Sequence, residues 1–313
     1  MQLFEGNEHY EADVRKIIVI GGMPRSGTNL VRRIIGSHSS IAIPHAEFTF
    51  LARVAHGAPL EAIFANPRLA TWKIAFNELS ALPPREAYLE ALTRYAQSKG
   101  KVHVGEKTPL NELHVDLLDA WFPGDELRFV QMVRNPIDVA ASRKEQLAKQ
   151  SPAPAGRLNM SDLASDWKRS VILGLARQYH TPRRHMLVRY EELTQRPEET
   201  TDSICHFLDV PFEPDRMLSL TDYKRNSDNS SFTADRIDEK TTDRVYRPPS
   251  RREHLEPEEA EVVGEICGEL AWALGYRDEL YSLAKKSGSA PSSNRRSIVR
   301  RLRALARRAV TTS

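Results

Sequence analysis

Two glycines five positions apart follow a buried apolar run near the start of the chain. The run KIIVI predicts a strand, and the next residues, GGMPRSGTNL, predict a turn that leads into a helix. A strand, a glycine-framed turn and a helix N-terminus together point several backbone N–H groups at an anion. The side chains of this turn that can contact an anion are Arg25, Ser26, Thr28 and Asn29, around Gly27. The pattern therefore predicts a phosphate site.

The loop departs from the Walker type at one decisive position. A Walker loop has a lysine directly after its second glycine, whereas Thr28 and Asn29 follow Gly27 here. The missing lysine argues against a magnesium-dependent nucleoside triphosphatase. A P-loop-type nucleotide-binding kinase of unusual kind remains an alternative, and it would need a magnesium-binding acid at a strand end.

A second strand-to-helix junction repeats the arrangement. In RFVQMVRNPIDVAASR, Arg134 ends a predicted strand, Pro136 opens a helix, and Ser142 lies eight residues after Arg134. A guanidinium beside a helix N-terminus is suited to a phosphate group. The two junctions together predict a ligand with two phosphate groups.

These two motifs closely resemble the cofactor-binding motifs of sulfotransferases that use 3′-phosphoadenosine 5′-phosphosulfate (PAPS). GEKTP and VRYEEL are also similar to that family, in a bacterial branch similar to tyrosylprotein sulfotransferases, and the resemblance covers roughly residues 17 to 276. It implies that the 5′-phosphosulfate binds at the Arg25 loop and the 3′-phosphate against Arg134 and Ser142. It also implies PAP as the product and no required metal.

The resemblance further implies a sulfuryl transfer to an acceptor hydroxyl by in-line attack. Glu47 in IPHAEF matches the general base of the tyrosylprotein branch, and His45 is the rival base because other branches use histidine. Lys107 in GEKTP would stabilise charge on the bridging oxygen and the sulfuryl group. The remaining matches are Ser231 near the sulfuryl group, and Tyr190, Arg247 and Arg251 around the cofactor.

Each of these residues also has a purely structural interpretation. Glu47 could be an acid near the start of the next helix, Lys107 a solvated lysine beside Glu106, and Tyr190 a core residue. The acceptor stays open among a carbohydrate, a lipid, a natural product and a peptide tyrosine, and the expected location favours a small molecule or a lipid-linked compound. A non-catalytic protein that binds a membrane surface is the alternative outside enzymes.

Alternating strands and helices must position these loops. Strands are expected at KIIVIGG, ELRFVQMVRNP and HMLVRYEEL, and at KVHVGEKTP as a strand that runs into a loop. Helices are expected at TNLVRRIIGS, EFTFLARVA, LNELHVDLLDAWFPG, IDVAASRKEQLAKQ and, with Ser161 as its N-cap, SDLASDWKRSVILGLARQYH. The pattern predicts an α/β fold with a P-loop-like central parallel sheet and helices on both faces. Ligands of such sheets bind where the strands end.

Composition indicates in which cell compartment the protein is expected and which partners it favours. Cys205 and Cys267 are far apart and lack a metal-ligand pattern, so two buried thiols in a reducing compartment are expected. The polar N-terminus has no signal-peptide pattern, and no apolar run of about 18 residues occurs. The sequence therefore predicts a cytoplasmic protein, with residues 1–16 as a polar extension and 17–284 as a single sulfotransferase domain.

The C-terminal segment, residues 285–313, combines a linker with a basic amphipathic tail. It holds nine Lys and Arg and no acid, and removing them from the net charge of +3 leaves −6 for the rest. An acidic body argues against nucleic acid as a partner. On a helix, Ile298, Leu302 and Leu305 share a face flanked by arginines, as in helices that lie on anionic membrane surfaces. Docking on the acidic body or a partner, and a solvated tail, are the alternatives. Membrane binding would make the protein peripheral at the inner membrane face.

Overall fold

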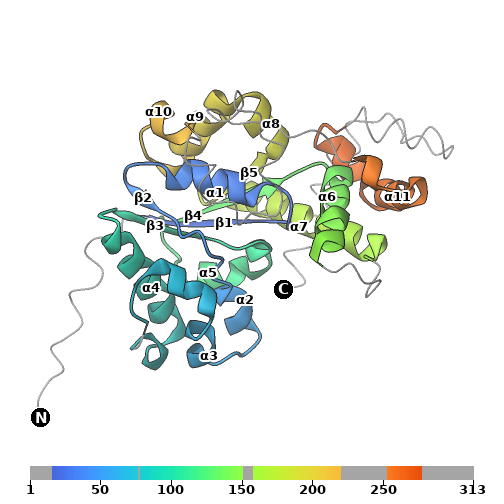
Figure 1. Ribbon diagram of the computed structural model, residues 1–313. Helices are drawn as coiled ribbons and strands as arrows, with labels where there is room; N and C mark the ends of the chain where they lie inside the picture. The colour runs from blue at the N-terminus through green and yellow to red at the C-terminus, as the bar shows by residue number, and fades with distance from the viewer. Residues whose placement is uncertain (1–15, 77, 151–157, 220–251, 277–313) are drawn as a thin grey trace, which may run out of the picture.

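A computed structural model describes residues 16–76, 78–150, 158–219 and 252–276 (Figure 1). Its centre is a five-stranded sheet in the order β2-β3-β1-β4-β5, and every neighbouring pair is parallel. The strands are β1 (Ile17–Gly22), β2 (Ile41–Ala42), β3 (His103–Lys107), β4 (Leu127–Val133) and β5 (His185–Arg189). The predicted parallel sheet is confirmed, with β2 as a fifth strand beyond the four expected. The strand expected at HMLVRYEEL is shorter than predicted, because β5 ends at Arg189 and a helix begins at Tyr190.

Helices cover both faces of the sheet and pack at one end of it (Figure 1). One face carries α1 (Thr28–Gly36), α8 (Tyr190–Gln195), α9 (Pro197–Leu208) and α10 (Pro214–Met217). The other carries α2 (Phe50–Ala55), α3 (Leu60–Phe64), α4 (Pro84–Ser98) and α5 (Val115–Trp121), with 3₁₀ turns at Pro67–Trp72, Leu79–Ala81 and Asn111–His114. The third group is α6 (Pro136–Gln150), α7 (Met160–His180) and α11 (Pro257–Ala273), with a 3₁₀ turn at Arg252–His254.

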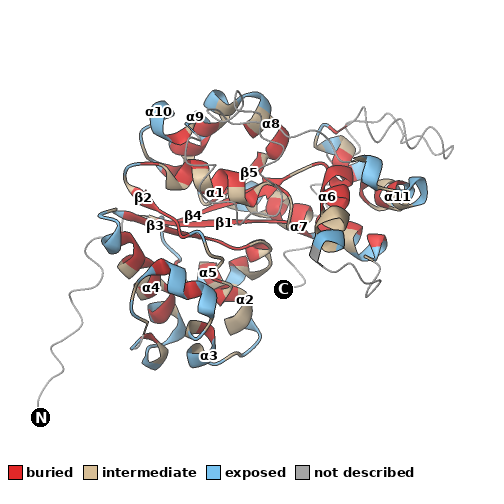
Figure 2. Ribbon diagram, viewed as in Figure 1, coloured by how far each residue is buried: buried red, intermediate tan, exposed pale blue. Residues whose placement is uncertain are grey.

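Alternate side chains of the central strand explain the two covered faces. Ile17 and Val19 of β1 pack into the cluster formed with α2 to α5, whereas Ile18 and Ile20 pack against α1, α8 and α9. A strand in the middle of a parallel sheet is buried on both faces, which requires a continuous apolar run. Figure 2 shows β1 to β4 as buried and the exposed residues on the outer sides of the helices and in the loops, whereas β5 is partly half-buried.

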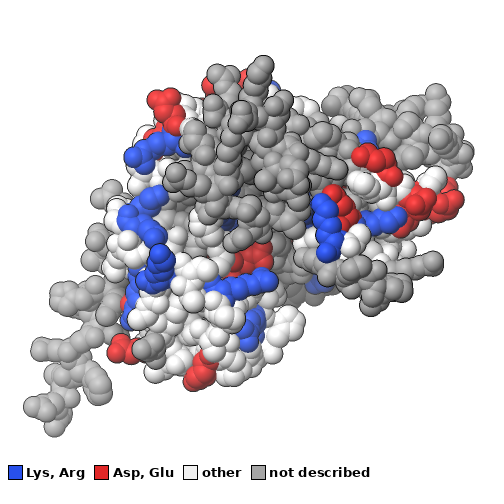
Figure 3. Space-filling view, in the orientation of Figure 1, with Lys and Arg blue, Asp and Glu red and all other residues white. Residues whose placement is uncertain are grey.

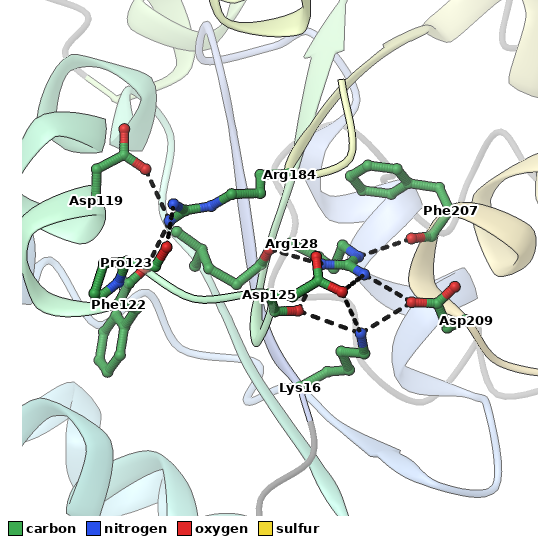
Figure 4. Close-up of polar contacts among 10 residues, drawn as sticks. Lys16, Asp119, Phe122, Pro123, Asp125, Arg128, Arg184, Phe207 and Asp209 are labelled. Atoms are coloured by element: carbon green, nitrogen blue, oxygen red, sulfur yellow. Dashed lines mark hydrogen bonds and ion pairs between the residues drawn. The ribbon is translucent and has the colours of Figure 1, made fainter. Parts of the chain in front are cut away.

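The amino end of the sheet is held by ion pairs. Arg128, at the start of β4, donates to Asp209 after α9 at 2.7 Å, to Asp125 at 3.1 Å and to the carbonyl of Phe207 at 3.0 Å (Figure 4). Lys16, just before β1, donates to the same Asp209 carboxylate at 2.9 Å. These side chains join the starts of two strands to the end of a helix.

Acidic and basic side chains also lie next to one another on the surface over α6 and α11 (Figure 3). Lys144 of α6 donates to Glu259 of α11 at 2.6 Å. Arg252 donates to both carboxylate oxygens of the buried Asp138, at 2.8 and 3.2 Å. These pairs attach the last described helix to the helix that carries Ser142.

Two predicted helix starts are wrong. The N-cap of α7 is Asn159, whose side chain accepts the N–H groups of Ser161 and Asp162, so Ser161 lies inside the first turn. Both residue types cap helices, and here the register follows Asn159. The helix expected from Glu47 begins only at Phe50, because Thr49 has a φ of 54°.

The single helix expected at LNELHVDLLDAWFPG is divided in the structure into a 3₁₀ turn and α5.

Two further expectations concern the cysteines and membrane-spanning segments. Cys205 and Cys267 are free and buried, as expected. None of the helices in the described part of the chain is long and apolar enough to cross a membrane.

Candidate active site

The turn after β1 forms a tight loop against the ring of Tyr190. Gly27 adopts a φ of 98° and is the N-cap of α1, and a Cβ placed there would come within 2.4 Å of Tyr190 Cδ2. A residue with a side chain fits neither the left-handed backbone nor the space. No described side chain caps α1, and the N–H of Leu30 donates to the carbonyl of Gly27 at 2.9 Å, so the N–H groups of Thr28 and Asn29 remain as first-turn donors for an anion among the described contacts.

Within this loop, the donors of Ser26 are engaged internally. Its hydroxyl donates to the carbonyl of Met23 at 2.6 Å, and its backbone N–H donates to the same oxygen at 3.1 Å. Ser26 and Thr28 are buried, whereas Arg25 and Asn29 are half-buried. In this structure Ser26 therefore closes the turn, and its hydroxyl proton is not directed to a ligand.

The loops after β1 and β4 lie in direct contact. Arg25 Nε donates to the hydroxyl of Ser142 at 3.0 Å, and Arg134 donates to the carbonyl of Arg25 at 3.1 Å. The guanidinium carbon of Arg134 lies 4.5 Å from the centre of the Tyr190 ring, within the range of a cation–π contact. Arg25, Arg134, Ser142 and Tyr190 are thus brought together from four elements of the chain.

These residues fit a ligand with anionic groups. The Nε of Arg134 is buried and has no hydrogen-bond partner among the described residues. The loop of Arg134 leads into α6, where the side chain of Asn135 accepts the N–H of Ile137 at 2.9 Å. Two guanidinium groups and two helix N-termini at one sheet edge form a cationic site.

Lys107 and Glu47 form an ion pair at the same edge. Lys107, the last residue of β3, is 2% exposed, and its Nζ donates to Glu47 Oε1 at 2.6 Å. Glu47 precedes α2 and has a side chain that is 33% exposed. Its segment is attached to β3 a second time, because the N–H of Thr49 donates to Thr108 Oγ1 at 3.2 Å. The solvated-lysine interpretation of Lys107 is therefore wrong.

Burial shifts the pKa values of Lys107 and of the neighbouring Glu106. Desolvation lowers the pKa of Lys107, and the neighbouring Glu47 carboxylate opposes that shift. Glu106 is fully buried, and desolvation raises its pKa to about 7 against hydrogen bonds from Thr108 and Asn111 at 2.8 Å each. Sequence reasoning missed Glu106, although its place two residues after the buried Val104 indicates an inward side chain.

Two other buried carboxylates were not predicted from the sequence. Glu112 accepts the N–H of Gly22 and Glu191 accepts the N–H of Asn135, so each contacts one of the two loops. Desolvation raises the pKa of Glu112, and hydrogen bonds from Ser170 and Gly22 oppose it. Glu191 had appeared only as part of VRYEEL, without a role of its own.

The remaining predicted residues are placed differently. His45 is exposed on the loop after β2, two residues before Glu47. Ser231, Arg247 and Arg251 lie outside the described residues, as does the tail. Within the described ranges, no three His, Cys, Asp or Glu side chains gather so that they could hold a metal ion.

Comparison with known families identifies this combination of fold and loops. The family model described as "Sulfotransferase family" matches residues 18–214, which include β1 after its first residue, β2 to β5, and both loops. The chain belongs to the sulfotransferase family. The match begins at the second residue of β1 and ends at the start of α10.

Individual relatives also match this chain. Nodulation protein NoeE of Sinorhizobium fredii is 27% identical over 291 residues, which cover 83% of this chain and 65% of that protein. A putative protein-tyrosine sulfotransferase of Caenorhabditis briggsae is 24% identical over 204 residues, covering 64% of this chain and 68% of that protein. An uncharacterized Aquifex aeolicus protein is 28% identical over 67% of this chain but only 28% of its own length.

Among solved structures, mouse sulfotransferase SULT7A1 complexed with PAP has the same fold. It superposes with a TM-score of 0.50 at 15% sequence identity, and the alignment covers 88% of this chain and 90% of the mouse chain. This likeness concerns the fold, a P-loop-like α/β sheet flanked by helices.

Proposed function

We propose that the protein transfers a sulfuryl group from PAPS to a hydroxyl group of an acceptor. The observation that carries the proposal is the contact between the two cationic loops, in which Arg134 bonds Arg25 and Arg25 bonds Ser142. PAPS has phosphate groups at both the 5′ and 3′ positions of one nucleoside, which suits two adjacent anion sites. The mouse relative of the same fold was solved with PAP, and the sulfotransferase family supports the reaction.

In the proposed binding mode the loop of residues 22–28 holds the 5′-phosphosulfate. Arg25, the N–H groups of Thr28 and Asn29, and the N-terminus of α1 would supply the donors there. Arg134 and Ser142 would hold the 3′-phosphate, and Tyr190 would support Arg134. Arg247 and Arg251 are proposed to contact the phosphates, and Ser231 the sulfuryl group.

The proposed reaction is an in-line displacement at sulfur. The acceptor oxygen forms a bond to sulfur as the bond from sulfur to the bridging phosphate oxygen breaks, and that oxygen leaves with the electron pair as part of PAP. The acceptor proton goes to Glu47 as general base. Lys107 stabilises the charge that develops on the bridging and sulfuryl oxygens. Because Lys107 now bonds Glu47, that bond must loosen as the lysine turns to the donor.

The acceptor is proposed to be a small molecule, a carbohydrate or a lipid-linked compound. The relatives include proteins named carbohydrate sulfotransferase 1 and a putative protein-tyrosine sulfotransferase, so acceptor class varies among them. We further propose that residues 17–284 form the catalytic domain in the cytoplasm. Residues 285–313 would attach it reversibly to an anionic membrane surface, where a lipid-linked acceptor would be accessible.

Transfer of labelled sulfur tests the proposal. The protein, with EDTA present, is incubated with ³⁵S-labelled PAPS and metabolite and lipid extracts, and labelled products are identified by mass spectrometry. We expect products with the wild-type protein and a loss of about 100-fold or more with Glu47→Gln, as for removal of a general base. Labelled products made equally by both proteins, or by neither, would contradict the proposed reaction.

A further inference from the structure

A buried carboxylate holds the start of the first phosphate loop. Glu112 is 1% exposed, and its Oε2 accepts the backbone N–H of Gly22 at 2.6 Å. Its Oε1 accepts the hydroxyl of Ser170, on α7, at 2.5 Å. A Cβ placed on Gly21 would lie 2.7 Å from Glu112 Oε2, so the missing side chain at Gly21 leaves room for the carboxylate. Glu112 therefore fixes the point at which β1 becomes the loop.

A second buried carboxylate has the same relation to the second loop. Glu191 is 7% exposed, and its Oε1 accepts the backbone N–H of Asn135 at 3.0 Å. Its Oε2 accepts the hydroxyl of Tyr276, beyond α11, at 3.0 Å. Glu191 directly follows Tyr190, whose ring lies against the guanidinium of Arg134. Asn135, the loop residue next to Arg134, is thus held by Glu191 of α8, and Tyr276 in turn holds Glu191.

Helix α7 contacts both Glu112 and the loop of Arg134. Trp167 of α7 donates its indole N–H to the carbonyl of Arg134 at 2.9 Å. Ser170, three residues later and on the same side of the helix, donates to Glu112. A single turn of α7 therefore supports the first loop through Glu112 and the second loop directly.

We propose that Glu112 and Glu191 are positioning residues, and that each fixes the geometry of one phosphate loop without contacting the ligand. This inference rests on the proposed function, with the 5′-phosphate in the first loop and the 3′-phosphate in the second. A hydrogen bond to a carboxylate is stronger than one between neutral groups, and burial excludes competing water. Each loop backbone is thereby ordered before the nucleotide arrives, and binding loses less conformational entropy.

The two loops can be probed separately with halves of the nucleotide. Affinities for 5′-AMP, 3′-AMP and PAP are measured by calorimetry, or by competition where binding is weak. We expect Glu112→Gln to weaken 5′-AMP about ten-fold and to leave 3′-AMP within about two-fold, since losing one charged hydrogen bond is of this order. Glu191→Gln should weaken 3′-AMP and spare 5′-AMP. Both substitutions should weaken PAP.

Milder substitutions keep the test valid if a glutamine variant does not fold. Ser170→Ala and Tyr276→Phe each remove the hydroxyl that holds the other carboxylate oxygen, so they should give smaller losses with the same selectivity. Glu192→Gln is the matched control, because Glu192 pairs with Arg189 at 3.2 Å on the same helix as Glu191. It should leave all three affinities unchanged.

The outcomes separate this inference from the function on which it rests. In one outcome, each variant lowers the affinities for 5′-AMP and 3′-AMP equally, together with the melting temperature. That result would assign both glutamates a merely structural role. Unchanged affinities in all four variants would also overturn the proposal. Failure of the wild-type protein to bind PAP would instead remove the proposed function.

Discussion

Lys107 and Glu47, sixty residues apart in the chain, are joined by a bond of 2.6 Å between an ammonium that is 2% exposed and a carboxylate at the rim of the site. A buried ammonium without its carboxylate partner would be costly. The two groups proposed as electrophilic stabiliser and as base therefore form an ion pair with each other in this structure. The pair is expected to separate when the sulfuryl group offers Lys107 new acceptors.

Replacing the proposed base should separate turnover from binding. Glu47→Gln is expected to lower turnover about 10²- to 10⁴-fold while PAP affinity stays nearly intact. Steady-state kinetics with PAPS and calorimetry with PAP measure the two quantities. His45→Ala is the comparison, since His45 is exposed on the same loop. Near-normal turnover in Glu47→Gln, with turnover abolished in His45→Ala, would move the role of base to His45.

Arg134 is the sharpest probe of the second phosphate site. A charged hydrogen bond to phosphate contributes about 1.5–3 kcal/mol, so Arg134→Ala should weaken PAP roughly 10- to 150-fold. Arg143→Ala is a matched control on α6, because Arg143 donates to Gln146 at 2.8 Å rather than to either loop. Calorimetry of both variants gives the comparison. Equal affinities for the two would exclude Arg134 from the site.

Gly27 should tolerate no side chain. Gly27→Ala places a Cβ within 2.4 Å of the Tyr190 ring at a φ of 98°, so both the melting temperature and PAP affinity should fall. Gly57→Ala is the control for backbone strain without a steric clash, because Gly57 has a φ of 75° and a Cβ placed there would have nothing within 4 Å. It should cost about 1–2 kcal/mol of stability and leave PAP affinity unchanged. Similar PAP affinities in the two variants would contradict the described packing of the loop.

Glu106 predicts a pH dependence of stability with a definite sign. Its pKa is raised to about 7 in the folded protein, so between its ordinary value and pH 7 the folded state binds more protons than the unfolded state. Stability from this group is therefore full at low pH and is lost as pH rises toward 7, by about 3 kcal/mol. Glu106→Gln removes the titration. Urea unfolding from pH 4.5 to 7.5 should show a flatter profile in the variant, and parallel profiles would disprove the prediction.

The basic tail is expected to bind anionic vesicles. Its arginines each add about 1 kcal/mol near an anionic leaflet, so binding should be strong at low salt and weaken as salt is added. Co-sedimentation compares the full chain with a chain that ends at Ser289. Equal binding by the two chains, or binding by neither, would exclude membrane attachment through the tail.

The sequence predicted those features that local patterns determine. The strand, turn and helix around Gly27 follow from an apolar run, two glycines and an amphipathic continuation, and α1 begins at Thr28 and ends at Gly36 as expected. Strand β2 has two residues, too few for a periodic pattern, and it forms only because β3 lies beside it. Residues 56–83, which gave no clear pattern, contain α3 and two 3₁₀ turns.

Interactions between distant residues could not be predicted in the same way. Glu112 bonds a residue 90 positions away and Glu191 one 56 positions away, and nothing in their own neighbourhoods indicates a buried carboxylate. Asn159 and Ser161 are both residue types that cap helices, so the sequence alone did not decide between them, and the side chain of Asn159 caps α7. Residue types thus suggested which loops bind phosphate, whereas the groups that hold the loops in place needed the fold.

Calorimetry with nucleotides tests whether the two loops hold the two phosphates of PAP. The full chain is titrated with PAP in EDTA, then with ATP in EDTA and with ATP and Mg²⁺. We expect that PAP binds in EDTA, that ATP binds more weakly because it lacks a 3′-phosphate, and that Mg²⁺ does not improve ATP binding. Absent PAP binding together with Mg²⁺-dependent ATP binding would rule out the proposed PAP site and favour a kinase.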